Sequence, residues 1–158
     1  MKVQTSGKKT ITPIDVVKLF LKLQDFDTDC GDVITNLKAQ KLIYYAQGIY
    51  MAKTGEPLFE DDFEAWQHGP VIPGLYRELK EFKNCQIQLE HNDESIDKFS
   101  DGQLNILISV YKTYGRYSAW ALRDMTHGES PWKDTLINEV ISKAKIKSYF
   151  ETVLATQG

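Results

Sequence analysis

The side chains best suited to chemistry in this chain are three histidines and two cysteines. His68, His91 and His127 could act as bases, and Cys30 and Cys85 as nucleophiles, but these residues lie far apart in the sequence. None of them belongs to a catalytic motif, because the sequence has no G-x-S-x-G elbow, phosphate-binding loop, dinucleotide fingerprint or H-E-x-x-H helix. The residue pattern therefore predicts a protein that is not an enzyme and that uses no cofactor.

A zinc site is the alternative use of the histidines. Zinc accepts imidazole and carboxylate ligands in a tetrahedron, so His68, His127 and Glu129 are conceivable ligands. The long spacing between the two histidines matches no metal motif. A simpler interpretation has each histidine hold a turn through hydrogen bonds, and we expect no metal.

His68 lies in a segment whose backbone has little freedom. This segment, which we call the first corner, covers residues 63–73 and reads FEAWQHGPVIP. Gly69 can adopt dihedral angles that are closed to other residues, Pro70 restricts the residue before it, and Pro73 suits the first turn of a helix. We predict a strand, a turn and a helix that hold His68 in a fixed direction.

The three tryptophans are the other candidate contact groups. Trp120 falls inside an expected helix, and we predict that it belongs to the core. Trp66 and Trp132 each lie near a proline and a His-Gly pair, the latter in the second corner, residues 126–132, which reads THGESPW. A rigid, partly exposed tryptophan is typical of an interface anchor, and for these two a core position and an interface position are equally compatible with the sequence.

Apolar periodicity predicts a mainly helical fold around one central helix, with a small β element. The expected helices cover residues 13–24, 36–53, the segment after Pro73, the segment from the Ser100 cap to about Gly115, 118–126, and the segment from Ser142 onward; short strands are expected at 63–67 and 86–90, with a loop at 91–100.

The helix at 36–53 is apolar around most of its circumference, which is typical of a central helix. Asn36, Gln40 and Gln47 fall within about 40° of each other on a helical wheel and give it one polar edge. This edge is open to two interpretations, ordinary contact with solvent or part of a groove for a partner.

Composition predicts one compact domain and argues against a nucleic-acid binder. The chain has 158 residues, 42% of them hydrophobic, and a formal net charge of -3. No part is strongly basic, and residues 61–100 are clearly acidic. The acidic run at 59–64 is expected to be a solvated edge, or alternatively a surface that attracts a basic partner.

Cysteine usage and hydropathy predict a cytoplasmic protein. Cys30 and Cys85 are far apart, so a disulfide framework is improbable. The first residues are basic and polar rather than an apolar signal core, and no apolar run approaches the length of a membrane span. Residues 1–11 are expected to be a flexible arm, followed by a single domain at 12–158.

Three segments in combination resemble the Panacea domain, a family that includes SocA-like antitoxins and prophage-encoded relatives. They are LKAQKLIYYAQ at 37–47, AWQHGPVIP at 65–73 with Tyr76 after it, and THGESPW at 126–132. With the helices between them, these segments cover about residues 12–155. The signature positions that the resemblance marks are Gln40, Tyr44, Trp66, His68, Pro70, His127, Pro131 and Trp132.

The resemblance implies an antitoxin that binds the toxin protein encoded by an adjacent gene and blocks it by direct contact. We expect aromatic residues of the two corners to line a groove beside the central helix. The residues that we expect to bind the partner are Gln40, Tyr44, Gln47, Trp66, His68, Tyr76, His127 and Trp132. The alternatives are an adaptor that delivers the toxin to a bacterial protease, and an enzyme that acts on the toxin through His68 and His127.

Overall fold

The computed structural model describes residues 10–27 and 32–157. The chain forms helices with one small sheet, which confirms the predicted fold class. The elements are α2 (Pro13–Asp25), α3 (Asn36–Thr54), β1 (Phe63–Trp66), β2 (Gly69–Val71), α4 (Pro73–Leu79), the 3-10 turn η1 (Lys80–Phe82), α5 (Glu94–Asp97), α6 (Asp101–Tyr114), α7 (Ala119–His127), α8 (Ser130–Lys133), β3 (Val140–Ile141) and α9 (Lys143–Gln157). Within the described ranges, every helix is too short or too polar to cross a bilayer.

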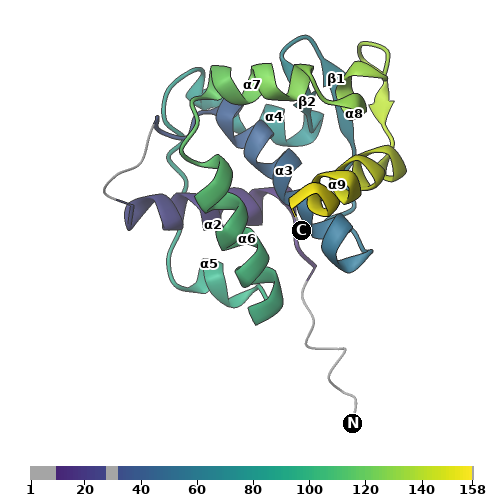
Figure 1. Cartoon of the computed structure of the whole chain (residues 1–158). Coiled ribbons are helices and arrows are strands. Elements are labelled where there is room, and N and C mark those ends of the chain that lie inside the picture. Colours follow the sequence, from purple (N-terminus) through teal and green to yellow (C-terminus); the bar gives the residue numbers. More distant parts are fainter. Residues whose placement is uncertain (1–9, 28–31, 158) are drawn as a thin grey trace.

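The helix α3 is central, as its pattern predicts. It begins after Thr35, whose side chain accepts a hydrogen bond from the Lys38 backbone, and it ends at Gly55, which has a left-handed φ of 84°. Most of its residues are buried. Figure 1 shows α3 in the middle of the fold, with α2 and α6 below it, α7 above it and α9 beside it.

The crossing of α3 and α9 is unusually close because of one glycine. A Cβ atom on Gly48 would lie 2.1 Å from the buried ring of Phe150 on α9. The same ring packs edge to face against Tyr44 and Tyr45, with centroid distances of 5.5 and 5.8 Å. Because Gly48 has no side chain, the Phe150 ring packs directly against the backbone of the central helix and completes an aromatic cluster with Tyr44 and Tyr45.

The first corner has the predicted strand, turn and helix. β1 lies between β2 and β3 in an antiparallel sheet, and Trp66 pairs with Gly69 across the tight turn that carries His68. Gly69 has a φ of 108°, which an L side chain rarely adopts. The sheet places His68 at its tip and directs the chain into α4.

The N-terminal helix α2 also begins where the sequence predicts. Thr12 and Asp15 form a reciprocal capping box, and Lys98 donates a hydrogen bond to the Asp15 carboxylate at 2.7 Å. Most of the expected arm, residues 1–9, lies outside the described residues. Ile11 at its end is packed in the core with 6% exposure, so this residue does not belong to a flexible arm.

Two local predictions are wrong. Residues 86–90 form no strand, because Ile87 makes a single backbone hydrogen bond to Ile34 and no ladder follows. Their alternation reflects the burial of Ile87 between exposed glutamines, not pairing in a sheet. The expected loop at 91–100 contains the short helix α5.

Candidate partner-binding site

The polar edge of α3 faces the protein interior, which corrects the interpretation that it contacts solvent, whereas Asn36 and Gln40 also line the groove described below. Gln40 accepts a hydrogen bond from the Ile72 backbone N–H at 3.0 Å and donates one to Asn36 at 3.0 Å. Asn36 in turn donates to the backbone carbonyl of Tyr76 at 3.2 Å. These two side chains hold the first corner and the start of α4 against the central helix.

Gln47, at the other end of the same edge, holds the loop that follows α3. It donates to the Phe59 carbonyl at 2.8 Å and accepts from the Leu58 N–H at 2.7 Å. Gln47 is fully buried. It therefore satisfies two backbone groups that the core would otherwise leave without partners.

Two buried lysines on α3 bind backbone carbonyls in the same way, and sequence reasoning missed them. Lys38 donates to the carbonyls of Asp32 and Gly115 at 2.9 and 2.7 Å, and Lys41 donates to the carbonyl of Pro70 at 2.9 Å. Burial, with a smaller contribution from the charge of Arg123, lowers the pKa of Lys41 to about 7. The lysines thus join the polar edge in fixing the loops around α3.

The second corner is held by a carboxylate in the core. Tyr44 and Tyr45 donate hydrogen bonds to the two oxygens of Glu129 at 3.1 and 2.8 Å. Burial raises the pKa of Glu129 to about 7, against the opposing effect of these hydrogen bonds. Tyr44 therefore acts on the second corner from inside the protein and has no exposed surface to offer a partner.

Strongly shifted pKa values like those of Lys41 and Glu129 also occur in active sites, but here both side chains are buried away from solvent. Lys41 is fully buried on the Pro70 carbonyl, and Glu129 is buried between two tyrosine hydroxyls. In the part of the chain that the structure describes, no three His, Cys, Asp or Glu side chains are grouped to hold a metal ion. The conceivable zinc ligands His68, His127 and Glu129 therefore form no such group.

The tryptophans of the two corners pack against each other. Trp132 donates to the Trp66 carbonyl at 2.8 Å and stacks on His127 with a centroid distance of 4.0 Å. Trp66 is also in edge-to-face contact with Tyr76 at 5.2 Å. All of these rings are partly buried, so Trp66 and Trp132 link the corners to each other while each keeps some exposed surface.

Within this cluster, one ring nitrogen of His127 lacks a hydrogen-bond partner among the described residues. This atom, Nε2, is buried. Burial and the nearby charge of Arg123 lower the pKa of His127. This lowering of the pKa favours the neutral imidazole, whose flat ring stacks on Trp132.

Trp120 is exposed, which corrects the prediction that it belongs to the core. It is 56% exposed on α7, with the Arg123 guanidinium 5.0 Å above its ring and His68 in edge-to-face contact at 5.4 Å. Arg123 also donates to Nδ1 of His68 at 3.2 Å. A helical wheel carries the missed signal, because Trp120 lies on the same face as Arg123 and Asp124, opposite the buried Leu122.

His68 and Trp120 stand at the edge of a groove of about 700 Å³ between α3, the first corner, α4 and α7. We call it the α3–α7 groove. Its apolar floor is formed largely by Leu37, Val71 and Tyr76. The remaining residues that line it are Thr35, Asn36, Gln40, Lys80, Lys83, Asn84 and Ala119.

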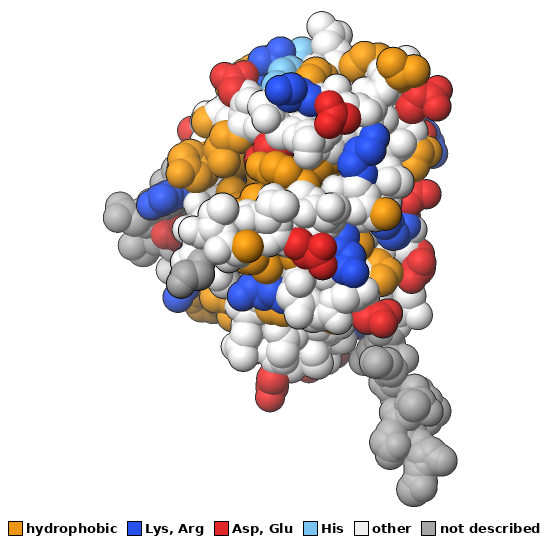
Figure 2. Space-filling view, turned by 45° about the vertical axis from the view of Figure 1, so that its right-hand side comes forward, with side chains coloured by type: hydrophobic (Ala, Val, Ile, Leu, Met, Phe, Trp, Pro, Cys, Tyr) orange, Lys and Arg blue, Asp and Glu red, His pale blue; other side chains and the backbone are white. Residues whose placement is uncertain are grey.

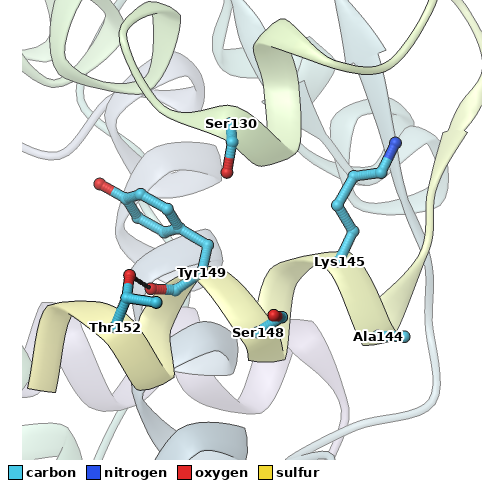
Figure 3. A pocket seen from close by; sticks show the side chains of 6 residues that line it. All are labelled: Ser130, Ala144, Lys145, Ser148, Tyr149 and Thr152. Atoms are coloured by element: carbon cyan, nitrogen blue, oxygen red, sulfur yellow. Dashed lines mark hydrogen bonds between the residues drawn. The ribbon is translucent and has the colours of Figure 1, made fainter. Parts of the chain in front are cut away.

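A second hollow, of about 510 Å³, lies between α8 and α9 (Figure 3). Figure 3 shows Lys145 and Tyr149 rising from α9 toward α8, with the Ser130 hydroxyl between them. Lys145 is already bound to the Asp134 carbonyl and the Thr135 hydroxyl at 2.8 and 3.3 Å. This hollow offers neither an aromatic anchor as exposed as Trp120 nor a free lysine, so the α3–α7 groove is the stronger candidate.

The charges of the surface agree with a protein partner. Figure 2 shows a face on which Lys and Arg side chains are interspersed with Asp and Glu. The acidic run near residue 60 is partly neutralised, because Lys143 binds the Asp62 carboxylate and the Glu60 carbonyl, both at 2.7 Å. Nucleic acid is better served by a concentrated basic face than by such mixed charge.

The candidate residues thus fall into three groups. Gln40, His68 and Tyr76 line the α3–α7 groove, whereas Tyr44 and Gln47 lie in the interior. Trp66, His127 and Trp132 form the packed contact between the corners. Partner contact stays a prediction for the first and third groups.

The segment that contains most of the central helix and both His-Gly corners matches a known protein family. Residues 39–133, more than half of the chain, match the family model described as "Antitoxin SocA-like, Panacea domain". The chain therefore belongs to this antitoxin family.

One similar protein is the Antitoxin SocA of Caulobacter vibrioides (strain NA1000 / CB15N), which is 50% identical over 44 residues. The alignment covers 28% of this chain and 23% of that protein, so the likeness is confined to a short stretch of both. No solved structure matches the chain.

Proposed function

We propose that this protein neutralises a toxin, encoded by an adjacent gene, by binding it directly at the α3–α7 groove. The observation that carries the proposal is the exposed Trp120, held beside His68 by Arg123. Exposed tryptophans with fixed orientation are typical of residues that dominate interface energy. The groove beside them gives the partner an apolar surface to fill.

The rigidity of the corners supports the same proposal. His68 and Tyr76 belong to a segment that Gln40, Asn36 and Lys41 bind through its backbone. A surface that is already ordered loses little conformational entropy when a partner binds. The buried polar residues of α3 thus contribute to binding indirectly, because they fix the residues that line the groove.

Co-expression with the neighbouring gene product tests the proposal. We expect the neighbour to be toxic alone, to be harmless together with this chain, and to co-purify with it as a complex. A neighbour that is harmless alone, or that stays toxic together with this chain, would refute the antitoxin role.

The fate of the toxin separates binding from delivery to a protease. Direct neutralisation predicts that the toxin persists in the cell at an undiminished level, bound to this chain. Loss of the toxin with a shortened half-life would instead assign the adaptor role. Pulse-chase labelling of the toxin with and without this chain measures the difference.

A further inference from the structure

We infer that the α3–α7 groove takes an acidic segment of its partner, in which Asp or Glu side chains flank apolar ones. This inference rests on the proposed function and adds the chemistry of the segment that binds. It reverses the expectation from the acidic run at 59–64, which favours a basic partner.

The charged side chains that line the groove are those of lysines. None of the described residues that line it is acidic, although the chain as a whole carries a net charge of -3. Lys80 and Lys83 are exposed on its wall, and among the described residues neither forms an ion pair. Two unpaired ammonium groups above an apolar floor are complementary to carboxylates beside apolar side chains.

The backbone of Lys83 supports the inference independently. Its φ of 53° and ψ of -127° place a non-glycine residue in a region that is normally reserved for glycine. Glycine at this turn would relieve the strain, but it would remove the ammonium group from the groove. Strain of this kind occurs at functional sites, where the side chain has a use that outweighs the cost.

A protein segment fits the groove better than nucleic acid does. Leu37, Val71 and Tyr76 make the floor apolar, whereas a phosphate backbone requires a continuous basic track. Glu78 and Glu81 are exposed on the neighbouring turns and would repel a continuous row of phosphates that extends beyond the two lysines. A polypeptide can place single carboxylates at the lysines and uncharged residues beside Glu78 and Glu81.

The test uses the full chain and the toxin encoded beside it, with the dissociation constant measured at low and high salt. We expect the double variant Lys80→Glu, Lys83→Glu to bind roughly tenfold or more weakly, and the wild-type affinity to fall with salt. The matched control is Lys53→Glu, Lys133→Glu, which reverses two exposed lysines outside the groove and is expected to bind normally. Equal binding by the two double variants would overturn the inference.

A photo-crosslinking amino acid at Asn84, an exposed residue of the groove wall, identifies the occupant. We expect it to attach to a toxin segment that contains Asp or Glu beside apolar residues. Attachment to a segment without carboxylates, or to nucleic acid, would overturn the inference while leaving the antitoxin role intact. If the wild-type chain binds no toxin at all, the proposed function itself fails.

Lys83→Gly separates a role in binding from a role in folding. We expect this variant to melt roughly 3 °C or more above the wild type, because the strain is relieved, and yet to bind the toxin more weakly. Higher stability with unchanged affinity would overturn the assigned role of Lys83. A lower melting temperature would overturn the argument from strain.

Discussion

Glu129 and Lys41 are ionisable residues buried in the core, and among the described residues neither forms an ion pair. Burial moves the pKa of each to about 7, from 4.5 for the carboxyl group and from 10.5 for the amine. The folded protein binds a proton at Glu129 more tightly than the unfolded chain, and at Lys41 more weakly. These two groups together therefore lower the free energy of unfolding most near neutral pH.

The variant Glu129→Gln tests this account at one residue. The contribution of Glu129 to stability is complete below pH 4.5 and is lost as the pH rises through about 7, a change on the order of 3 kcal/mol. Glutamine has no such charge and keeps one carbonyl oxygen, which can accept from one of the two tyrosine hydroxyls. We expect the variant to gain stability relative to the wild type between pH 5 and pH 8, measured by urea unfolding. Parallel pH profiles of the two proteins would contradict the prediction.

The tryptophans give a second prediction at the residue scale. Trp120→Ala removes an exposed ring and is expected to change the melting temperature little while abolishing protection from the toxin. Trp132→Ala removes a partly buried ring that donates to the Trp66 carbonyl, and is expected to destabilise the fold by about 3 kcal/mol. Thermal melting and a co-expression assay on both variants check the contrast. Normal protection by a normally folded Trp120→Ala would contradict the role of the groove.

At the scale of elements, α3 organises the molecule through two kinds of contact. Its apolar residues pack against α6, α7 and α9, and its polar residues bind the backbone of the loops between them. A glycine permits the contact with α9, because the Phe150 ring occupies the space that a side chain at residue 48 would need. The packing of α3 therefore depends on the small Gly48 as well as on the large apolar residues.

Gly48→Ala tests the crossing of α3 and α9. A methyl group there would overlap the buried Phe150 ring, which packs against Tyr44 and Tyr45, so we expect a loss of roughly 1–3 kcal/mol. Gly74→Ala is the matched control in α4, since a Cβ atom at that position meets no atom within 4 Å. Denaturant unfolding is expected to show the control as stable as the wild type, or slightly more stable. Equal stability of Gly48→Ala and the control would contradict the close crossing.

The elements also show how far sequence reasoning reaches. The helices at 13–24 and 36–53 and the strand at 63–67 follow from local signals, such as the Thr12 cap and the Gly55 stop, and they are confirmed. The burial of the polar edge of α3 could not be predicted, because a helical wheel shows which residues share a face but not which loops cover it. The prediction for Trp120 is wrong because it rests on the residue type, whereas the face of the helix on which Trp120 lies decides its exposure.

On the scale of the whole molecule, the family motifs and the exposed surface have different parts. The motif residues on α3 and in the second corner mostly lie inside, where Tyr44, Gln47 and Glu129 fix loops. The α3–α7 groove combines the first corner with Trp120 and two lysines that belong to none of the three motifs. The sequence motifs could therefore predict the scaffold and one wall of the site, whereas the opposite wall required the packing of α7.

The central claim is that the protein binds the toxin at the α3–α7 groove and inhibits it in a fixed molar ratio. The most direct measurement is a titration of a fixed amount of purified toxin with this chain, with residual toxin activity as the readout and Trp120→Ala as the comparison. The account predicts that activity falls linearly to zero at a fixed stoichiometric ratio, and that the folded variant fails to reach this endpoint. Full inhibition by a small fraction of an equivalent, or equal inhibition by Trp120→Ala, would contradict it.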